Sequence, residues 1–174
     1  MRRVWMEHVW WTRNVILGII SDLPGTPEYT ARLLQNPADM MAVFAPYYTA
    51  PRDRAILAQL QSLFTDHLKT GGDIVTAAKA GNTALVTQLQ TQWHQNSDQI
   101  AHAFAQLNPA YDETTVRNMM YTHLQLTTNE ATQNLSHQYA DEVKTFDQIQ
   151  AEALMMADYF TAGLLAQATS HTVG

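Results

Sequence analysis

The stretch TAAKAGNTAL, residues 76–85, decides the architecture, because it separates two long segments whose apolar residues recur at helical spacing. Gly81 is placed to end the first segment, since glycine readily adopts the left-handed backbone that closes a helix. Asn82 follows directly, and asparagine is among the best N-cap residues for a new helix. So short a connection predicts that the two helices pack side by side in opposite directions.

Similar punctuation divides the rest of the chain, and the alternation typical of strands is nearly absent. Long helices are expected over residues 2–22, 51–80, 83–107, 113–138 and 140–168, with short ones over 27–35 and 37–45. The final residues, 170–174, are expected to fray. The expected fold class is therefore all-α, an up-and-down bundle of four to five helices, ferritin-like or hemerythrin-like in character. Two short helices would lie between its first and second long helices.

Composition narrows the class of protein. The chain has 174 residues, 46% of them hydrophobic, which predicts a single helical-bundle domain over residues 1–174. A formal net charge of −6 argues against a nucleic-acid partner, because no basic surface is available to neutralise phosphates. No apolar run is long enough to span a membrane and no signal-peptide pattern is present, so we expect a cytoplasmic protein without a membrane partner. The lack of cysteine excludes disulfides and thiolate metal sites.

Three histidines replace apolar residues in the predicted helices. His8, His67 and His123 each fall in the apolar row of a different helix. Glu130 lies in the same row as His123. Burying such groups costs free energy unless they are paired, and helical bundles build metal sites from inward polar residues on facing helices.

Heights along the bundle follow from counting residues away from the turns. His67 lies fourteen residues before Gly81, and His123 lies fourteen residues after the next turn, so both are expected at one level. The same counting places the His94–Asn96–Asp98 group and the turn of helix at 154–158 in this layer. Glu130 is expected to face Asp147 in a second layer, about 10 Å away along the helices. The height of the first helix stays open, because two short helices intervene.

These residues predict a metal site, since imidazoles and carboxylates together suit iron, manganese, nickel or zinc. The expected ligands are, first, His8, His67, His123 and Glu130 and, second, Glu7 and Asp147. A metal-dependent redox or metal-handling role would follow, with hydrolysis at metal-bound water also open. The alternative is a non-enzymatic interaction or small-molecule-binding bundle whose histidines form a hydrogen-bond network without metal. Whether the protein is an enzyme, its catalytic residues and any small-molecule ligand stay undefined.

Surface features give two further expectations. Exposed aromatic residues would suit a homodimer, and the sequence suggests these candidates: Trp5, Trp10, Tyr47 and Tyr48. The two tryptophans are alternatively expected to pack in the core or between helices, and the two tyrosines to edge a pocket or close one end of the bundle. Arg13 is expected to form a surface ion pair with Glu7 or Asp22, or to serve an anionic ligand. The paired Glu-x-x-His signature of di-iron bundles and the His-Glu-x-x-His signature of zinc proteases are both absent.

Several segments resemble known families, and the resemblance spans nearly the whole chain. They include EHVWWTR (7–13), WHQNSDQIA (93–101), NMMYTHLQLTTNEA (118–131) and FDQIQAEALMMAD (146–158). These segments resemble a family of small, uncharacterised all-α proteins of low-GC Gram-positive bacteria, some of which are labelled acetylglutamate kinase. That label does not fit this sequence, because the kinase fold is α/β and longer, with glycine-rich nucleotide loops that are absent here.

A second resemblance covers the first helix alone. The opening Glu7-His8-Val9-Trp10-Trp11 is similar to the start of a bacterial ferritin-like family of metalloproteins. This resemblance implies metal binding, and neither resemblance implies a substrate.

Overall fold

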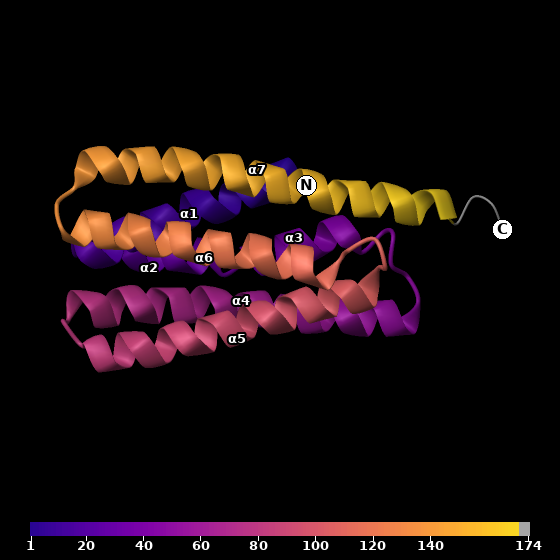
Figure 1. Ribbon diagram of the computed structural model, residues 1–174, viewed down its shortest axis with the longest axis horizontal. Coiled ribbons are helices and arrows are strands. Elements are labelled where there is room, and N and C mark those ends of the chain that lie inside the picture. The colour runs from indigo at the N-terminus through magenta and orange to yellow at the C-terminus, as the bar shows by residue number, and fades with distance from the viewer. Residues whose placement is uncertain (171–174) are drawn as a thin grey trace.

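The computed structural model describes residues 1–170, which form helices and no strand (Figure 1). The long helices are α1 (Arg2–Ile20), α4 (Pro51–Lys79), α5 (Thr83–Leu107), α6 (Glu113–Leu135) and α7 (Tyr139–Ser170); the short ones are α2 (Thr26–Leu33) and α3 (Asn36–Phe44). This confirms the all-α class and the expected place of the short helices. Residues 171–174, most of the end that was expected to fray, lie outside the described residues. None of the described helices is both long and apolar enough to cross a membrane.

The turn between α4 and α5 forms as its sequence predicts. Gly81 has a φ of 72°, in the left-handed region that glycine tolerates without a side-chain clash. The Asn82 side chain then accepts a hydrogen bond of 3.1 Å from the backbone N–H of Leu85. A helix stop and a helix start thus share two consecutive residues, which reverses the chain.

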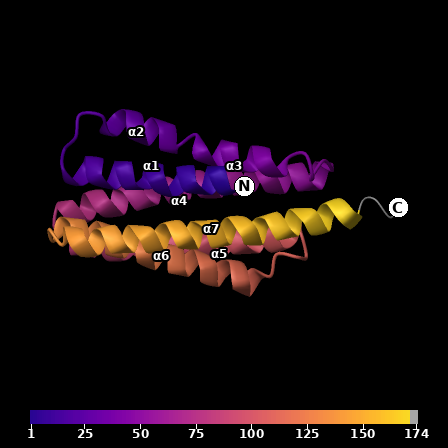
Figure 2. The ribbon, with the colours of Figure 1, turned by 90° about the horizontal axis from the view of Figure 1, so that it is seen from above.

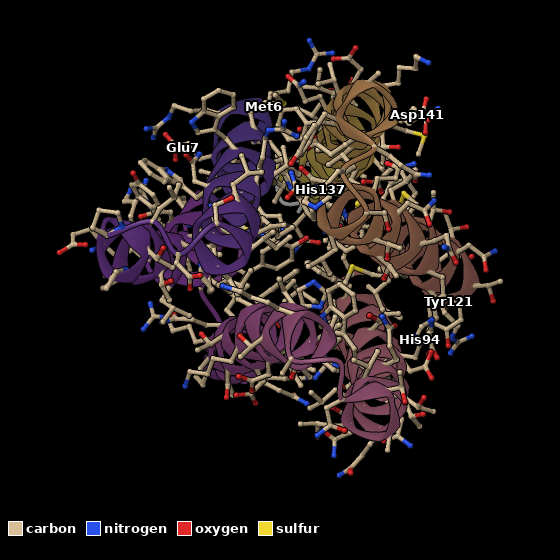
Figure 3. All side chains as sticks on the ribbon, turned by 90° about the vertical axis from the view of Figure 1, so that its left-hand side faces the viewer. Met6, Glu7, His94, Tyr121, His137 and Asp141 are labelled. Carbon is tan, nitrogen blue, oxygen red and sulfur yellow. The ribbon has the colours of Figure 1, made fainter. Side chains whose placement is uncertain are left out.

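The long helices form a closed ring around one core, as the end-on view of Figure 3 shows. Contacts link α1 to α4, α4 to α5, α5 to α6, α6 to α7, and α7 back to α1. Tight turns make α4 through α7 alternate in direction. Helix α1 runs in the same direction as α4 and α6 (Figure 1 and Figure 2). On these parallel helices, a step of four residues along the chain moves toward the same end of the bundle.

An aromatic cluster closes the core near the loop between α5 and α6. Tyr111, in that loop, is buried and donates a hydrogen bond of 2.9 Å to the backbone carbonyl of Phe160. Its ring packs against Gly163, where an added Cβ would lie only 1.9 Å from the Tyr111 Cε1 atom. The loop is therefore fixed against α7 by a contact that only glycine permits.

The aromatic residues expected at the surface divide into two groups. Trp5 and Tyr48 are buried in the core, so neither is available to a dimer surface, and the alternative of core packing is confirmed for Trp5. Trp5 stacks on Phe160 with a centroid distance of 5.6 Å. Burying an aromatic ring in such a contact is more favourable than leaving the ring in water. Trp10 and Tyr47 are exposed, at 54% and 41%. A homodimer through aromatic residues would rest on these two.

Candidate metal centre

Three imidazoles from the three parallel helices meet inside the ring. His8 on α1, His67 on α4 and His123 on α6 are only 2%, 2% and 3% exposed. One ring nitrogen of each lies within 4.8 Å of one ring nitrogen of the others. The ring centroids are 5.4 to 6.3 Å apart. His8 thus reaches the level that His67 and His123 share.

The His8 ring is oriented from the short helix α3. Its Nδ1 atom lies 3.0 Å from Oδ1 of Asn36. The Nδ2 group of Asn36 donates to the Val4 carbonyl at 2.9 Å, so Oδ1 is the atom that faces the imidazole. Oδ1 can only accept, and therefore His8 carries its hydrogen on Nδ1 and keeps a lone pair on Nε2.

Asn96 on α5 orients His67 in the same way. Oδ1 of Asn96 lies 3.3 Å from Nδ1 of His67, while Nδ2 of Asn96 donates to the Leu63 carbonyl at 2.9 Å. The third ring has a carboxylate partner, since Nδ1 of His123 lies 3.3 Å from Oε2 of the buried Glu152 on α7. Each Nδ1 is thus engaged by a neighbouring helix, which leaves each Nε2 for the centre of the cluster.

Buried imidazole nitrogens that lie this close together favour a hydrogen-bond donor or a cation between them. A proton is disfavoured, because burial and then the nearby His123 lower the pKa of His8 to about 3. Burial, followed by the charges of His123 and His8, also lowers the pKa of His67 well below its usual range. A water molecule has two hydrogens for three lone pairs. A metal ion can accept all three, and outward Nδ1–H bonds of this kind are how proteins fix metal-binding imidazoles.

The chain matches no protein-family model, no curated protein and no solved structure.

Glu130 is buried as expected, at 2% exposure, but its partner is not the imidazole cluster. The side chain of Arg13 on α1 points between the helices, with its Cζ atom 4.4 Å from the ring centroid of Phe146. It donates hydrogen bonds to Glu130 Oε1 at 2.8 Å and to both carboxylate oxygens of Glu142. Burial raises the pKa of Glu130 to about 7; Arg13 works against this shift and Glu142 adds to it. The expected surface pairing of Arg13 with Glu7 or Asp22 is therefore wrong, since the partly buried guanidinium pairs with the two buried carboxylates beside it.

The two secondary acidic candidates lie away from the histidines. Glu7 points to the outer side of α1, where it pairs with Arg3 and Arg32 at 3.3 Å each (Figure 3). Asp147 is exposed on α7. Among the described residues, the group of side chains close enough to hold a metal consists of His8, His67 and His123. The structure thus brings together three of the six predicted ligands.

Sequence reasoning found one of the three residues that orient the rings and missed two. Asn96 is buried at the level of His67 and His123, as the counting predicts, although its role in orienting His67 was not foreseen. Asn36 was missed because it lies on a short helix whose height could not be counted from a turn. Glu152 is a buried carboxylate at 6% exposure that lies two residues before the predicted 154–158 turn of α7. A search for buried carboxylates near that level would have found it.

A small cavity adjoins the imidazoles. Its volume is about 40 Å³, and it lies toward the turn between α4 and α5. Trp93 forms part of its wall and donates a hydrogen bond from Nε1 to the His67 carbonyl at 3.0 Å. Its ring lies against Gly71, where an added Cβ atom would be only 3.3 Å from the indole. The absence of a side chain at Gly71 therefore lets α5 approach α4 beside the cluster.

Proposed function

We propose that the protein is a metal-binding helical bundle that holds one divalent transition-metal ion on Nε2 of His8, His67 and His123. The supporting observation is that one nitrogen of each ring lies within 4.8 Å of one nitrogen of the others, while every Nδ1 contacts a polar partner on another helix. Each Nε2 is thereby left as the nitrogen that can bind a metal. Imidazole suits zinc, iron, nickel and copper, whereas manganese prefers oxygen ligands. With three imidazoles and no carboxylate, manganese drops out of the metals expected from the sequence, and zinc, iron and nickel remain. Copper joins them, because it also binds imidazole well.

The spacing is compatible with a site that tightens on metal binding. Zinc–imidazole bonds of about 2.0–2.1 Å in a tetrahedron place the nitrogens about 3.3 Å apart. Starting from separations within 4.8 Å, each ring would move inward by about 1 Å or less. Three protein ligands leave a fourth position open, which is the arrangement of catalytic rather than structural metal sites.

The charge of the ion also has a counterpart. Glu152 contacts His123 from outside the cluster, and carboxylate–imidazole pairs of this kind strengthen the imidazole as a ligand. The other oxygen of Glu152, Oε1, is buried and has no hydrogen-bond partner among the described residues. An unpaired carboxylate is costly inside a protein, and a nearby divalent cation would offset that cost.

An open position beside a cavity supports a metal-dependent redox or metal-handling role, and the bundle would then belong with the ferritin-like or hemerythrin-like architectures. Elemental analysis of protein purified without an affinity tag tests the proposal, with His67→Gln as the variant and His137→Gln, at an exposed position, as its control. We expect about one ion per chain in the wild type and in H137Q, and loss of that ion in H67Q. Trace metal only, together with a melting temperature that chelators leave unchanged, would contradict the proposal.

A second candidate is the non-enzymatic bundle whose histidines form a hydrogen-bond network. The observation in its favour is that the buried Nδ1 bonds to Asn36, Asn96 and Glu152 need no metal to form. It predicts that H67Q lowers the free energy of unfolding by the same amount with and without chelator. The metal centre predicts a larger loss in the absence of chelator.

A further inference from the structure

The layer next to the imidazoles is built from small residues at matching positions. Thr12, Gly71 and Thr127 each follow a histidine of the cluster by four residues on its own helix. Because α1, α4 and α6 run in the same direction, these positions lie one helical turn beyond the cluster on the same side. All three line the cavity. The space beside the candidate metal is therefore made by the choice of two threonines and a glycine where larger residues would fill it.

The lining of this cavity is nearly free of polar groups. Beyond the small layer it consists mostly of aliphatic side chains, which include Val15, Ile16, Leu68, Ile74, Val75 and Ala131. No charged side chain of the described residues lines it, apart from what the histidines would carry. A volume of about 40 Å³ holds about three water-sized molecules. The site therefore excludes carboxylates, phosphates and any ligand of ordinary metabolite size.

The two threonine hydroxyls of this layer differ in their hydrogen bonding. Thr127 donates its hydroxyl to the His123 carbonyl at 2.9 Å. The Thr12 hydroxyl oxygen, in contrast, is buried and has no hydrogen-bond partner among the described residues. Leaving a buried hydroxyl unpaired is unfavourable. A ligand in the cavity is the partner that would satisfy it.

We propose that the cavity binds a small uncharged molecule of two or three non-hydrogen atoms, the size of dioxygen, as the fourth ligand of the metal. The Thr12 hydroxyl donates a hydrogen bond to this ligand, and the aliphatic walls exclude charged competitors. The step is simple coordination, in which a lone pair of the ligand enters the open position and a water molecule leaves. This inference rests on the proposed metal centre and names the class of molecule that the centre takes.

A route from solvent supports the same class of ligand. A surface groove of about 340 Å³ lies between α1, α2 and α4. The groove and the cavity share five lining residues, four with apolar side chains and one glycine: Val15, Ile19, Leu33, Leu68 and Gly72. The wall between solvent and cavity is thus one apolar layer thick. Small neutral molecules cross such a layer through side-chain fluctuations, and ions do not.

Nitric oxide is a suitable probe for a ligand bound to the metal, and xenon is a suitable probe for the cavity in the absence of metal. The protein is loaded with ferrous iron, its iron content is measured, and nitric oxide, azide and acetate are titrated separately under anaerobic conditions. Binding of nitric oxide is followed by the electron paramagnetic resonance signal of the ferrous nitrosyl complex. Separately, metal-free crystals are pressurised with xenon. We expect nitric oxide to bind at one per iron, azide and acetate not to bind, and xenon to occupy the cavity.

Variants locate the ligand within the molecule. Thr12→Val keeps the shape and removes the hydroxyl, so nitric oxide affinity should fall about five- to tenfold, the effect of one hydrogen bond, while Thr12→Ser should keep it. Ala131→Leu fills the cavity, so it should abolish xenon binding and lower the affinity for nitric oxide at least tenfold. Ala151→Leu, on the exposed side of α7, is the control and should change neither xenon binding nor nitric oxide affinity. Iron content should stay at one per chain in all four.

The outcomes separate this inference from the proposed function. Failure to retain zinc, iron, nickel or copper overturns the proposed metal centre, and the metal-borne ligand with it. Retention of another of these metals but not of iron leaves the proposed centre standing and overturns this inference alone. Iron retained at one per chain, but with azide bound as tightly as nitric oxide or with no xenon in the cavity, overturns this inference alone. Nitric oxide binding that A131L leaves unchanged also overturns it, because the ligand would then lie elsewhere.

Discussion

Asn36 and His8 form a buried hydrogen bond of 3.0 Å that joins the short helix α3 to the first long helix. The same amide donates to the Val4 carbonyl on α1, so it contacts α1 at two points one helical turn apart. This relationship gives α3 a role beyond connection, because it sets both the tautomer and the direction of one imidazole of the cluster.

The first prediction concerns this contact. Asn36→Ala should lower metal affinity about 10–100-fold, the usual effect of removing a group that orients a ligand. The His8 ring would be free to rotate, and the Val4 carbonyl would lose its donor. Competition with a chromogenic chelator measures the affinity, with Asn118→Ala at an exposed position of α6 as the control. Equal affinities in N36A and wild type would show that α3 does not orient the site.

The second prediction follows from the pKa of Glu130, which burial raises to about 7. Between the unfolded value near 4.5 and 7, the native state holds more protons than the unfolded state, so stability falls as pH rises. Glu130→Gln removes this dependence. The free energy of unfolding of E130Q minus that of the wild type should therefore increase from pH 5 to 7, by up to about 1.4 kcal/mol per unit, and level off above pH 7.

Denaturant unfolding at half-unit pH intervals measures this difference, and Glu28→Gln, at an exposed position of α2, is the control. A difference that is flat between pH 5 and 7 would mean that Glu130 is ionised throughout and that Arg13 outweighs burial.

The third prediction concerns the metal-free cluster in acid. His8 has a native pKa of about 3, below its unfolded value of about 6.5, so the unfolded state takes up the proton first. Its neutral form stabilises the fold above pH 6.5, and that contribution is lost as pH falls toward 3. The stability of the wild type relative to His8→Gln should decrease by about 1.4 kcal/mol for each pH unit below 6.5. His137→Gln, at the surface, serves as the reference, and a relative stability independent of pH would contradict a neutral, buried His8.

The fourth prediction compares two glycines in long helices. Gly163→Ala should lower the free energy of unfolding by about 3 kcal/mol or more, since its Cβ would stand 1.9 Å from the buried ring of Tyr111. Gly72→Ala should instead raise it by about 0.5–1 kcal/mol, because no atom lies within 4 Å and alanine is the better helix former. Thermal or denaturant unfolding decides the matter, and a stable G163A would show that the Tyr111 loop can move away from α7.

Local signals account for what could be predicted. Gly81 and Asn82 mark a helix end and a helix start by their own backbone and side-chain preferences, so the turn between α4 and α5 needs no knowledge of the tertiary structure. Ends without such a signal were placed less well, since α1 ends at Ile20 instead of residue 22 and α6 at Leu135 instead of residue 138. Counting from the turns then places His67 and His123 at one level, because α4, α5 and α6 are joined by tight connections. The cluster confirms that level.

Non-local packing accounts for what was missed. The height of α1 depends on how α2 and α3 fold back, and no local rule fixes that. The prediction that Glu130 faces Asp147 is wrong for the same reason, because Asp147 is exposed and Arg13 reaches Glu130 from α1. Arg13 also pairs with Glu142, so both glutamates belong to an ion-pair cluster and not to the imidazoles. The prediction that Glu130 points inward is confirmed. A periodic pattern identifies which face of a helix is buried, but it does not identify the residue on another helix that contacts that face.

The parallel course of α1, α4 and α6 has a consequence for the order of assembly. His8 leaves the ribosome first, yet its two companions belong to helices made much later, so no early hairpin contains more than one of the three rings. An ion bound by all three can be captured only when the ring closes, and capture would then draw the folding equilibrium toward the closed form by mass action. Metal occupancy would thereby be confined to chains in which the ring of helices has closed.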